Sequence, residues 1–296
     1  MAVLSTPRSA VQLASKGRPV REHLFRIALI ASLGIAFVFL AALLSYVLVE
    51  GWPRIDSRLW ENMPSVRNPD IAGAQSAITG TLWVISLTAL LTLPTGIAAA
   101  IYLEEYADKT RWWNRVIELN IQNLAAIPSI VYGILGLGII ARTFGLGFSV
   151  ITASMTLGLL VLPIVIIASR EAIRAVPPSI REGSLALGAT QWQTISRQVL
   201  PASIPGIATG SILALSRAIG EAAPLLMLGA VSFIRFNPDG VFASYTVLPI
   251  QIFNWISQSR EGFHVLASAA IVILLLILLL MNSVAIWLRN RYQKRW

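Results

Sequence analysis

Six segments of this chain are apolar over about 20 residues, and this pattern restricts its fold more than any other feature. An α-helix of that length crosses about 30 Å of hydrocarbon, so each segment can span a membrane. The first segment is too long for a signal-peptide core and lacks an obvious small-residue cleavage site after it, so we interpret it as a retained span. The expected fold is an all-α integral membrane protein with six transmembrane helices. The predicted spans are 27–49, 78–103, 121–140, 150–168, 204–233 and 265–288.

The composition agrees with a membrane protein and excludes several kinds of site. Hydrophobic residues make up 56% of the chain and charged residues only 12%, whereas soluble domains usually carry about 25% charged residues. The chain has no cysteine, which excludes disulfides and thiolate metal sites. Its two histidines, His23 and His264, lie far apart in the sequence, so a metal site is not expected.

The distribution of positive charge predicts the orientation of the spans. With six spans, both tails and the 104–120 and 169–203 loops lie on one side, which collects 16 of the 23 Lys and Arg residues. Six of the others lie in the opposite loops and one lies inside a span. Because positive residues concentrate in cytoplasmic loops, both termini are predicted to be cytoplasmic. The net charge of +9 is therefore interpreted as membrane topology and not as a nucleic-acid surface.

The loop 170–201 is polar, long for a connection between spans, and contains two helical patterns. Pro177-Pro178 ends the helix that precedes it, because proline disfavours helix at the residue before it. Gly188 interrupts the two patterns, and Leu200-Pro201 is expected to end the second. Together these features predict a helix, a glycine turn and a second helix on the cytoplasmic surface. Two pairs of residues have capping-box spacing, which predicts two helix starts: Ser179 with Glu182, and Thr190 with Gln193.

The same loop resembles the cytoplasmic signature of ABC importer permeases, written E-A-A, three residues, G, nine residues, I, one residue, L-P. Gly183 and Ser184 replace the two alanines, and Gln198 stands where isoleucine is usual. The resemblance implies that the loop fits a cleft on a separate ATPase subunit and receives its motion. The alternative is an ordinary amphipathic loop. The matching positions, which are the predicted ATPase-coupling residues, are Glu182, Gly183, Ser184, Gly188, Leu200 and Pro201.

Other stretches resemble one branch of this family, the PstA-type permease subunits of the bacterial phosphate ABC importer. The resemblance covers roughly 73–290, and the Ala-Pro-Leu and Leu-Pro-Ile-Gln runs favour the A-type subunit over its paired C-type partner. The stretches that carry it are Pro94-Thr95-Gly96, Ala99–Ala107, Ile127–Gly133, Ser216–Leu225 and Leu248–Trp255.

This resemblance implies a domain organisation and a set of partners. The organisation comprises a basic cytoplasmic tail (1–26), a first span (27–49), an external loop (50–75) and an ABC type-1 transmembrane domain (76–290) that contains the coupling loop 170–201. The expected partners are a homologous C-type permease in a heterodimer, two ATPase subunits, an extracytoplasmic phosphate-binding protein and membrane lipid, without nucleic acid. No cofactor is expected on this chain, because ATP and magnesium belong to the ATPase. The expected location is the bacterial cytoplasmic membrane.

Arg217 and Glu221 are charged residues inside the predicted fifth span. Four residues apart on a helix, they would share one face. An arginine at the centre of a span costs roughly 2.5–3.5 kcal/mol, so it usually faces a bundle interior, a water cavity or a partner charge. Since a guanidinium matches phosphate oxygens with two parallel hydrogen bonds, we expect the pair to line the substrate path. The alternative is a structural ion pair without a role in transport.

The sequence lacks the motifs of an enzyme that could power transport alone. It contains no G-x-x-x-x-G-K-[ST] phosphate-binding loop, and no serine, histidine and carboxylate set is suggested. The predicted function is therefore that of a permease subunit that moves inorganic phosphate with energy from a partner ATPase. Three alternatives are an ABC permease for molybdate or sulfate, a proton- or sodium-driven transporter, and an additional role in nutrient sensing. Broken half-helices would favour the ion-driven transporter, and the sequence shows none.

Overall fold

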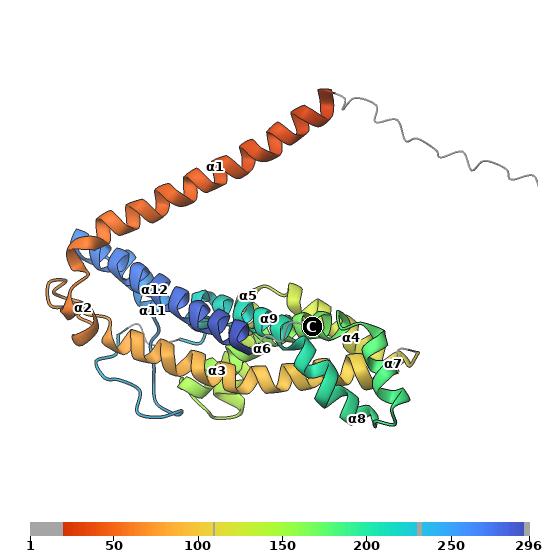
Figure 1. Cartoon of the computed structure of the whole chain (residues 1–296). Helices are drawn as coiled ribbons and strands as arrows, with labels where there is room; N and C mark the ends of the chain where they lie inside the picture. The colour runs from red at the N-terminus through yellow and green to blue at the C-terminus, as the bar shows by residue number, and fades with distance from the viewer. Residues whose placement is uncertain (1–19, 109, 230–232, 293–296) are drawn as a thin grey trace, which may run out of the picture. The chain divides into compact units, whose positions relative to one another are not determined.

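A computed structural model describes residues 20–108, 110–229 and 233–292, and the regular elements in these residues are all helical (Figure 1). The elements up to the third span are α1 (Val20–Gly51), η1 (Trp52–Arg54), α2 (Ser57–Glu61), α3 (Gln75–Ile101), the π turn η2 (Tyr102–Tyr106), α4 (Trp112–Ala126), α5 (Ser129–Leu135) and the π segment η3 (Gly136–Thr143). The remaining elements are α6 (Val150–Arg174), α7 (Pro178–Ala186), α8 (Gln191–Thr194), the π turn η4 (Ile195–Val199), α9 (Leu200–Gly220), α10 (Ala223–Met227), α11 (Leu248–Ile256) and α12 (Glu261–Tyr292).

The chain divides into two compact units, residues 1–49 and 50–296. In the first unit, α1 contains the predicted span 27–49 in one helix that is long and apolar enough to cross a membrane. In the second unit, the predicted spans 78–103, 150–168 and 265–288 each fall on one long apolar helix, which begins at Gln75, Val150 and Glu261 respectively. These four span predictions are confirmed.

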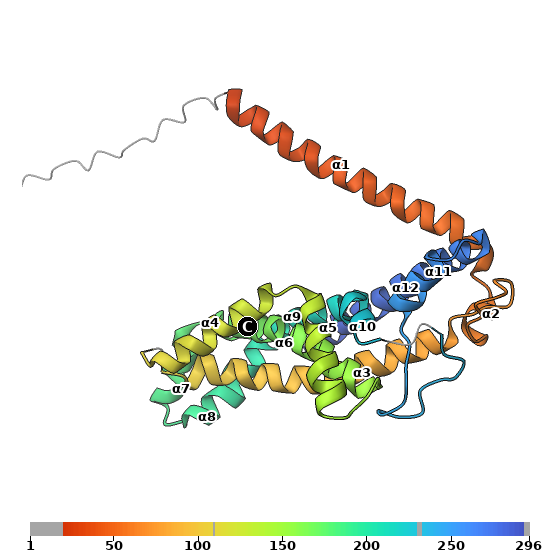
Figure 2. The ribbon, with the colours of Figure 1, turned by 180° about the vertical axis from the view of Figure 1, so that it is seen from behind.

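The predicted third span, 121–140, is wrong as a single helix. The chain turns by 106° between Trp112–Ala126 and Ser129–Thr143, and Figure 2 shows this corner between α4 and α5. Ile127 and Pro128 are extended at the corner, with ψ angles of 134° and 136°. Proline causes this break, because it lacks an N–H donor and its ring disfavours helix at the residue before it. The third crossing is therefore two shorter helices.

The predicted fifth span, 204–233, is also wrong at its C-terminal end. Helix α9 ends at Gly220, and Glu221 is extended with φ −79° and ψ 110°. Pro224 explains the end of the helix, because a proline ring clashes with the carbonyl four residues earlier, here Gly220. Pro224 then lies at the start of the short helix α10, where its missing N–H would have no helical partner in any case.

The same span begins much earlier than the sequence predicted. Residues Gln191–Gly220 form one helical run, so Leu200-Pro201 does not end a helix as expected. The π turn η4, Ile195–Val199, lies immediately before this dipeptide. In an α-helix the N–H of residue 201 would bond the carbonyl of Arg197, and proline has no such donor. The wider turn lets the chain continue through the proline without a break.

The two predicted helix starts in the coupling loop had different outcomes. Ser179 is not an N-cap, because α7 begins at Pro178 with Pro177 as its N-cap and without a side-chain cap. Proline is favoured at the first helical position, which explains the difference. Thr190 is the N-cap of α8 as predicted. Its hydroxyl accepts from the Gln193 N–H at 3.2 Å, and the Gln193 side chain accepts from the Thr190 N–H at 2.9 Å.

Helix α6 lies at the centre of the second unit, between α3 and α9 (Figure 1). Small residues let α9 approach it closely. A Cβ added at Gly206 or Gly210 would lie 2.6 Å or 2.3 Å from the Cβ of Ala172 or Ala168. These glycines are four residues apart and therefore share a helix face, so α6 and α9 pack as membrane helices with small residues at the interface.

Candidate functional site

The predicted coupling residues lie on a hairpin made of α7, a turn at Gly188, α8 and η4, here called the α7–α8 hairpin (residues 178–199). Gly188 has a φ of +84°, a conformation that glycine adopts without strain and that closes the hairpin. The Ser184 and Thr194 hydroxyl oxygens lie 2.9 Å apart and join the two arms. Glu182 is exposed on α7, and Gly183 has open space around it. The signature residues Glu182 to Gly188 thus lie together on one exposed element.

The α7–α8 hairpin presents an apolar tip and a groove. Leu187 is 91% exposed, next to the turn, and Trp192 on the other arm is 60% exposed. A groove of about 450 Å³ runs between the arms, lined in part by Ile180, Leu187 and Arg197. An exposed leucine at this position indicates a binding surface for an apolar partner, because burying a leucine side chain contributes about 1.5–3 kcal/mol. The remaining signature residues, Leu200 and Pro201, are only partly buried and lie at the base of the hairpin.

A network of ion pairs joins the α7–α8 hairpin to the helices beneath it. Arg181 of α7 donates from Nε and Nη2 to Glu105 Oε1, at 3.1 Å and 2.8 Å. Glu104, the neighbouring residue in η2, binds Arg170 and Arg174 of α6, with N–O distances of 3.4 Å and 3.0 Å. The side chains of Glu104 and Arg170 are 5% and 9% exposed. Buried charges of this kind are held because each has a partner.

Sequence reasoning missed this network. The signal was a pair of adjacent carboxylates, Glu104-Glu105, at the end of the second span, and two arginines, Arg170 and Arg174, at the end of the fourth. Both span ends were predicted to lie on the same side of the membrane. The i, i+4 spacing of the arginines places them on one helix face, where they could meet a shared carboxylate. The missing step was to pair charges across spans and not only within one.

Arg217 and Glu221 do pair, but in a different setting from the predicted one. The Nε of Arg217 lies 3.1 Å from Glu221 Oε1. Arg217 belongs to the last turn of α9, whereas Glu221 is its C-cap and leaves the helix. The Arg217 side chain is 48% exposed within the chain and that of Glu221 is 17% exposed. The pair therefore marks the break in the fifth span and not the middle of a helix.

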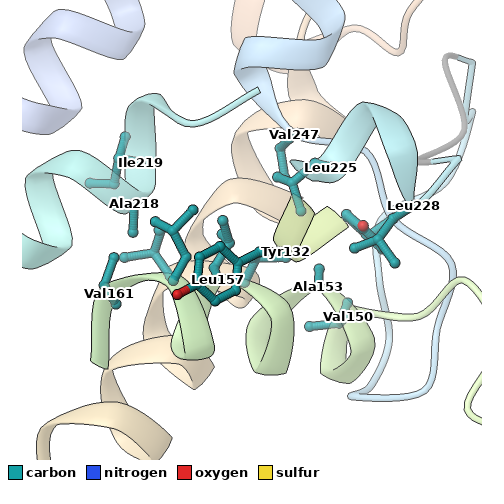
Figure 3. Close-up of a cluster of buried hydrophobic side chains, with 14 of the residues drawn as sticks. Tyr132, Val150, Ala153, Leu157, Val161, Ala218, Ile219, Leu225, Leu228 and Val247 are labelled. Atoms are coloured by element: carbon teal, nitrogen blue, oxygen red, sulfur yellow. The ribbon is translucent and has the colours of Figure 1, made fainter. Parts of the chain in front are cut away.

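The break in the third span lies close to the break in the fifth. Helix α5 packs on α10, and a Cβ at Gly133 would lie 2.6 Å from the Pro224 carbonyl oxygen. The Tyr132 hydroxyl donates to the Leu124 carbonyl across the corner at 2.7 Å. Its ring belongs to a buried cluster with Ala218 and Leu225, which flank the second break (Figure 3). Two broken helices thus form one packed region beside the Arg217–Glu221 pair.

Two polar contacts fix α9 against α12, and an apolar groove lies along the same helices. Ser216 donates to Asn282 Oδ1 at 2.6 Å, one residue before Arg217, and Arg289 donates to Thr209 Oγ1 at 3.0 Å. The groove has a volume of about 630 Å³ and is lined by residues of α3, α9 and α12, including Ile204 and Leu215. One face of α9 is therefore open to another apolar surface.

The described residues hold no group of three or more His, Asp or Glu side chains that could bind a metal ion. The chemistry that the site does offer is charge and shape. It has one half-exposed guanidinium at a helix break, an exposed hairpin with an apolar tip, and a partly buried network of ion pairs beneath the hairpin.

Comparison with known proteins gives a family and a fold. The family model described as binding-protein-dependent transport system inner membrane component matches residues 92–296. The phosphate transport system permease protein PstA 1 of Mycobacterium tuberculosis is 34% identical over 80% of this chain and 78% of its own length. The phosphate transport system permease protein PstA of Yersinia pestis is 32% identical over 90% of both chains. A bacterial alginate ABC transporter, solved with its alginate-bound periplasmic protein, matches 93% of this chain and 96% of its own at 17% identity, with a TM-score of 0.68.

Proposed function

The chain belongs to the family of binding-protein-dependent transport system inner membrane components, and from this premise we propose that it is the permease subunit of an ATP-driven phosphate importer. The observation that supports phosphate as the substrate is the sequence identity of 32–34% to phosphate permeases over 80–90% of the chain. The chain is a multi-pass protein of the cytoplasmic membrane. It acts as a permease and not as an enzyme.

The α7–α8 hairpin is the docking element for the ATPase in this proposal. Its exposed apolar residues, Leu187 and Trp192, need a partner surface, and the groove between the arms gives shape to the contact. The ATPase binds ATP and magnesium and supplies the energy, since this sequence has no phosphate-binding loop. A hairpin that faces a cytoplasmic ATPase places both termini in the cytoplasm, in agreement with the distribution of Lys and Arg.

Arg217 is the proposed phosphate contact in the path. Its Nε donates to Glu221, and within the described residues its two terminal nitrogens donate no hydrogen bond. These nitrogens can donate two parallel, charge-assisted hydrogen bonds to one phosphate. Glu221 keeps the Arg217 guanidinium oriented when no phosphate is bound. Its negative charge weakens anion binding enough to permit release.

A second permease is needed to complete the path. The Arg217 side chain is half exposed, and the apolar groove along α9 is open on one side. A homologous C-type permease in a heterodimer would cover these surfaces and enclose the anion. The full complex would then contain two permeases, two ATPase subunits and an extracytoplasmic phosphate-binding protein.

The test of this function is ATP-dependent uptake of radiolabelled phosphate by the reconstituted complex, with molybdate and sulfate as competitors. The expected result is uptake that requires ATP and the binding protein and that resists both competitors. Uptake of molybdate or sulfate instead would keep the architecture and overturn the substrate. Uptake driven by a proton or sodium gradient without the ATPase would overturn the proposal as a whole.

The docking role of the α7–α8 hairpin gives a separate prediction. Leu187→Glu places a charge where an apolar contact is expected, so the ATPase should no longer copurify with the permeases. The side chain is 91% exposed, so the variant should fold as the parent does. Phe242→Glu is a matched control, because Phe242 is 67% exposed and lies outside the hairpin. Retention of the ATPase by Leu187→Glu would show that the tip is not the docking surface.

A further inference from the structure

Arg181 makes more hydrogen bonds than an ordinary surface arginine. Besides its two bonds to Glu105, it donates from Nη1 to the Val176 carbonyl at 2.6 Å and from Nη2 to the Ile173 carbonyl at 2.8 Å. Ile173 lies in the last turn of α6, where its carbonyl also accepts from the Val176 N–H at 3.2 Å. Arg181 thus joins its own helix, α7, to the end of α6 and to η2. The side chain is only 22% exposed.

Glu105 receives both arms of the α7–α8 hairpin. Its carboxylate accepts from Arg181 of the first arm, and its backbone carbonyl accepts from the Gln191 Nε2 of the second arm at 2.7 Å. The Glu105 side chain is 10% exposed, so little water competes for the ion pair. Because both arms of the hairpin are bonded to Glu105, a movement of the hairpin would displace Glu105.

The segment that carries Glu105 differs from the helix before it. It is the π turn η2, Tyr102–Tyr106, which continues α3 at its end. Single π turns inside helices are rare and are frequent at functional sites. Glu104 in the same turn binds Arg170 and Arg174 of α6. Of the two adjacent carboxylates, Glu105 therefore binds the hairpin and Glu104 binds the central helix α6.

We propose that Glu105 and Arg181 form the joint through which movement of the α7–α8 hairpin reaches α3 and α6. The inference rests on the proposed function, in which a partner ATPase moves this hairpin. Both residues are positioning residues, since neither lies at the Arg217–Glu221 pair nor on the exposed tip. The joint holds α3 and α6 to the hairpin, so that the helices of the bundle turn together and not one at a time.

The test measures phosphate transported per ATP hydrolysed by the reconstituted complex. Glu105→Gln and Arg181→Gln each leave one largely buried charge without its ionic partner, so we expect this ratio to fall about tenfold or more. ATP hydrolysis and copurification of the ATPase should continue, because the exposed tip is unchanged. The double variant should lose no more than Arg181→Gln alone, because both changes remove the same Glu105–Arg181 ion pair. Glu171→Gln is the matched control. It removes a 64% exposed carboxylate of the same network and should keep the parental ratio.

The proposed role of the Glu105–Arg181 pair would be refuted by a parental ratio in both single variants or by additive losses in the double variant. Loss of the ATPase from the complex would also refute it, because the pair would then be part of the docking surface. If the Arg181→Gln permease is not obtained as a folded protein, Arg181→Lys is the substitute. It keeps the charge but loses the fork of nitrogens that bonds the Ile173 and Val176 carbonyls, so its ratio is expected to fall in part. If the parent complex transports molybdate or sulfate, only the proposed substrate is refuted. The proposal for Glu105 and Arg181 can then be tested as the amount of that anion transported per ATP hydrolysed.

Discussion

Arg217→Gln is expected to lower ATP-dependent phosphate uptake about a hundredfold or more, because it removes the only cation proposed to bind the anion in the path. Glutamine keeps much of the length of the side chain and one amide donor but has no charge and no fork of nitrogens. The Arg217 side chain is 48% exposed within the chain, so its loss should leave folding and assembly intact. The measurement is initial uptake by proteoliposomes, with the intact complex verified by copurification.

Two further variants separate a substrate contact from a structural ion pair. Arg217→Lys keeps the charge without the planar fork, so uptake should be weakened and not abolished. Glu221→Gln removes only the counter-charge and should leave phosphate bound more tightly and released more slowly. Arg142→Gln, at an exposed arginine in η3, is the control and should transport as the parent does. Normal uptake by Arg217→Gln would remove Arg217 from the path.

Gly133→Val is expected to abolish uptake by separating the two broken spans. A Cβ at this position would lie 2.6 Å from the Pro224 carbonyl oxygen and 2.7 Å from Pro224 Cα. Both are backbone contacts, so relief requires movement of α10 as a whole. Overpacking usually costs about 1–3 kcal/mol, and here the shift would also displace the break that carries Glu221. Thermal unfolding of the purified complex and uptake should both decrease.

Gly138→Val provides the comparison for this prediction. Gly138 lies five residues later in the same bent half of the third crossing, and a Cβ there would meet nothing within 4 Å. Valine therefore replaces a helical glycine at both positions but clashes at only one. Equal behaviour of the two variants would show that contact between α5 and α10 is not required.

Local chemistry allowed some features to be predicted from the sequence. The capping box at Thr190 involves only residues within one turn, and the turn at Gly188 requires a conformation that glycine adopts readily. The long spans were also predictable, since their length depends on bilayer thickness and not on neighbours. Identification of Arg217 and Glu221 as a pair needed only their spacing, although the helix does not contain both. Their role in the path remains a prediction.

Features that depend on tertiary packing were predicted less well. A hydropathy run continues through Pro128 and Pro224, so the sequence showed prolines that can kink a span but not that both spans are fully interrupted there. In an isolated span such breaks would leave polar backbone groups in lipid, but neighbouring helices surround them here. We interpreted broken half-helices as favouring an ion-driven transporter, and their presence in a member of a binding-protein-dependent transport family shows that they do not separate the two classes. The pairing of Glu104 with Arg170 required knowledge of which span ends meet.

Helix α9, Leu200–Gly220, connects the base of the hairpin to the break at Glu221 with a fixed length and a fixed rotation. At 1.5 Å per residue, Arg217 lies about 25 Å along this helix from Leu200 at the base of the hairpin. Each residue also turns the helix by about 100°, so the number of residues between them determines the direction in which the guanidinium points. One inserted residue would rotate Arg217 away from the path without changing any side chain. The residue count of this segment is thus a constraint on transport in its own right.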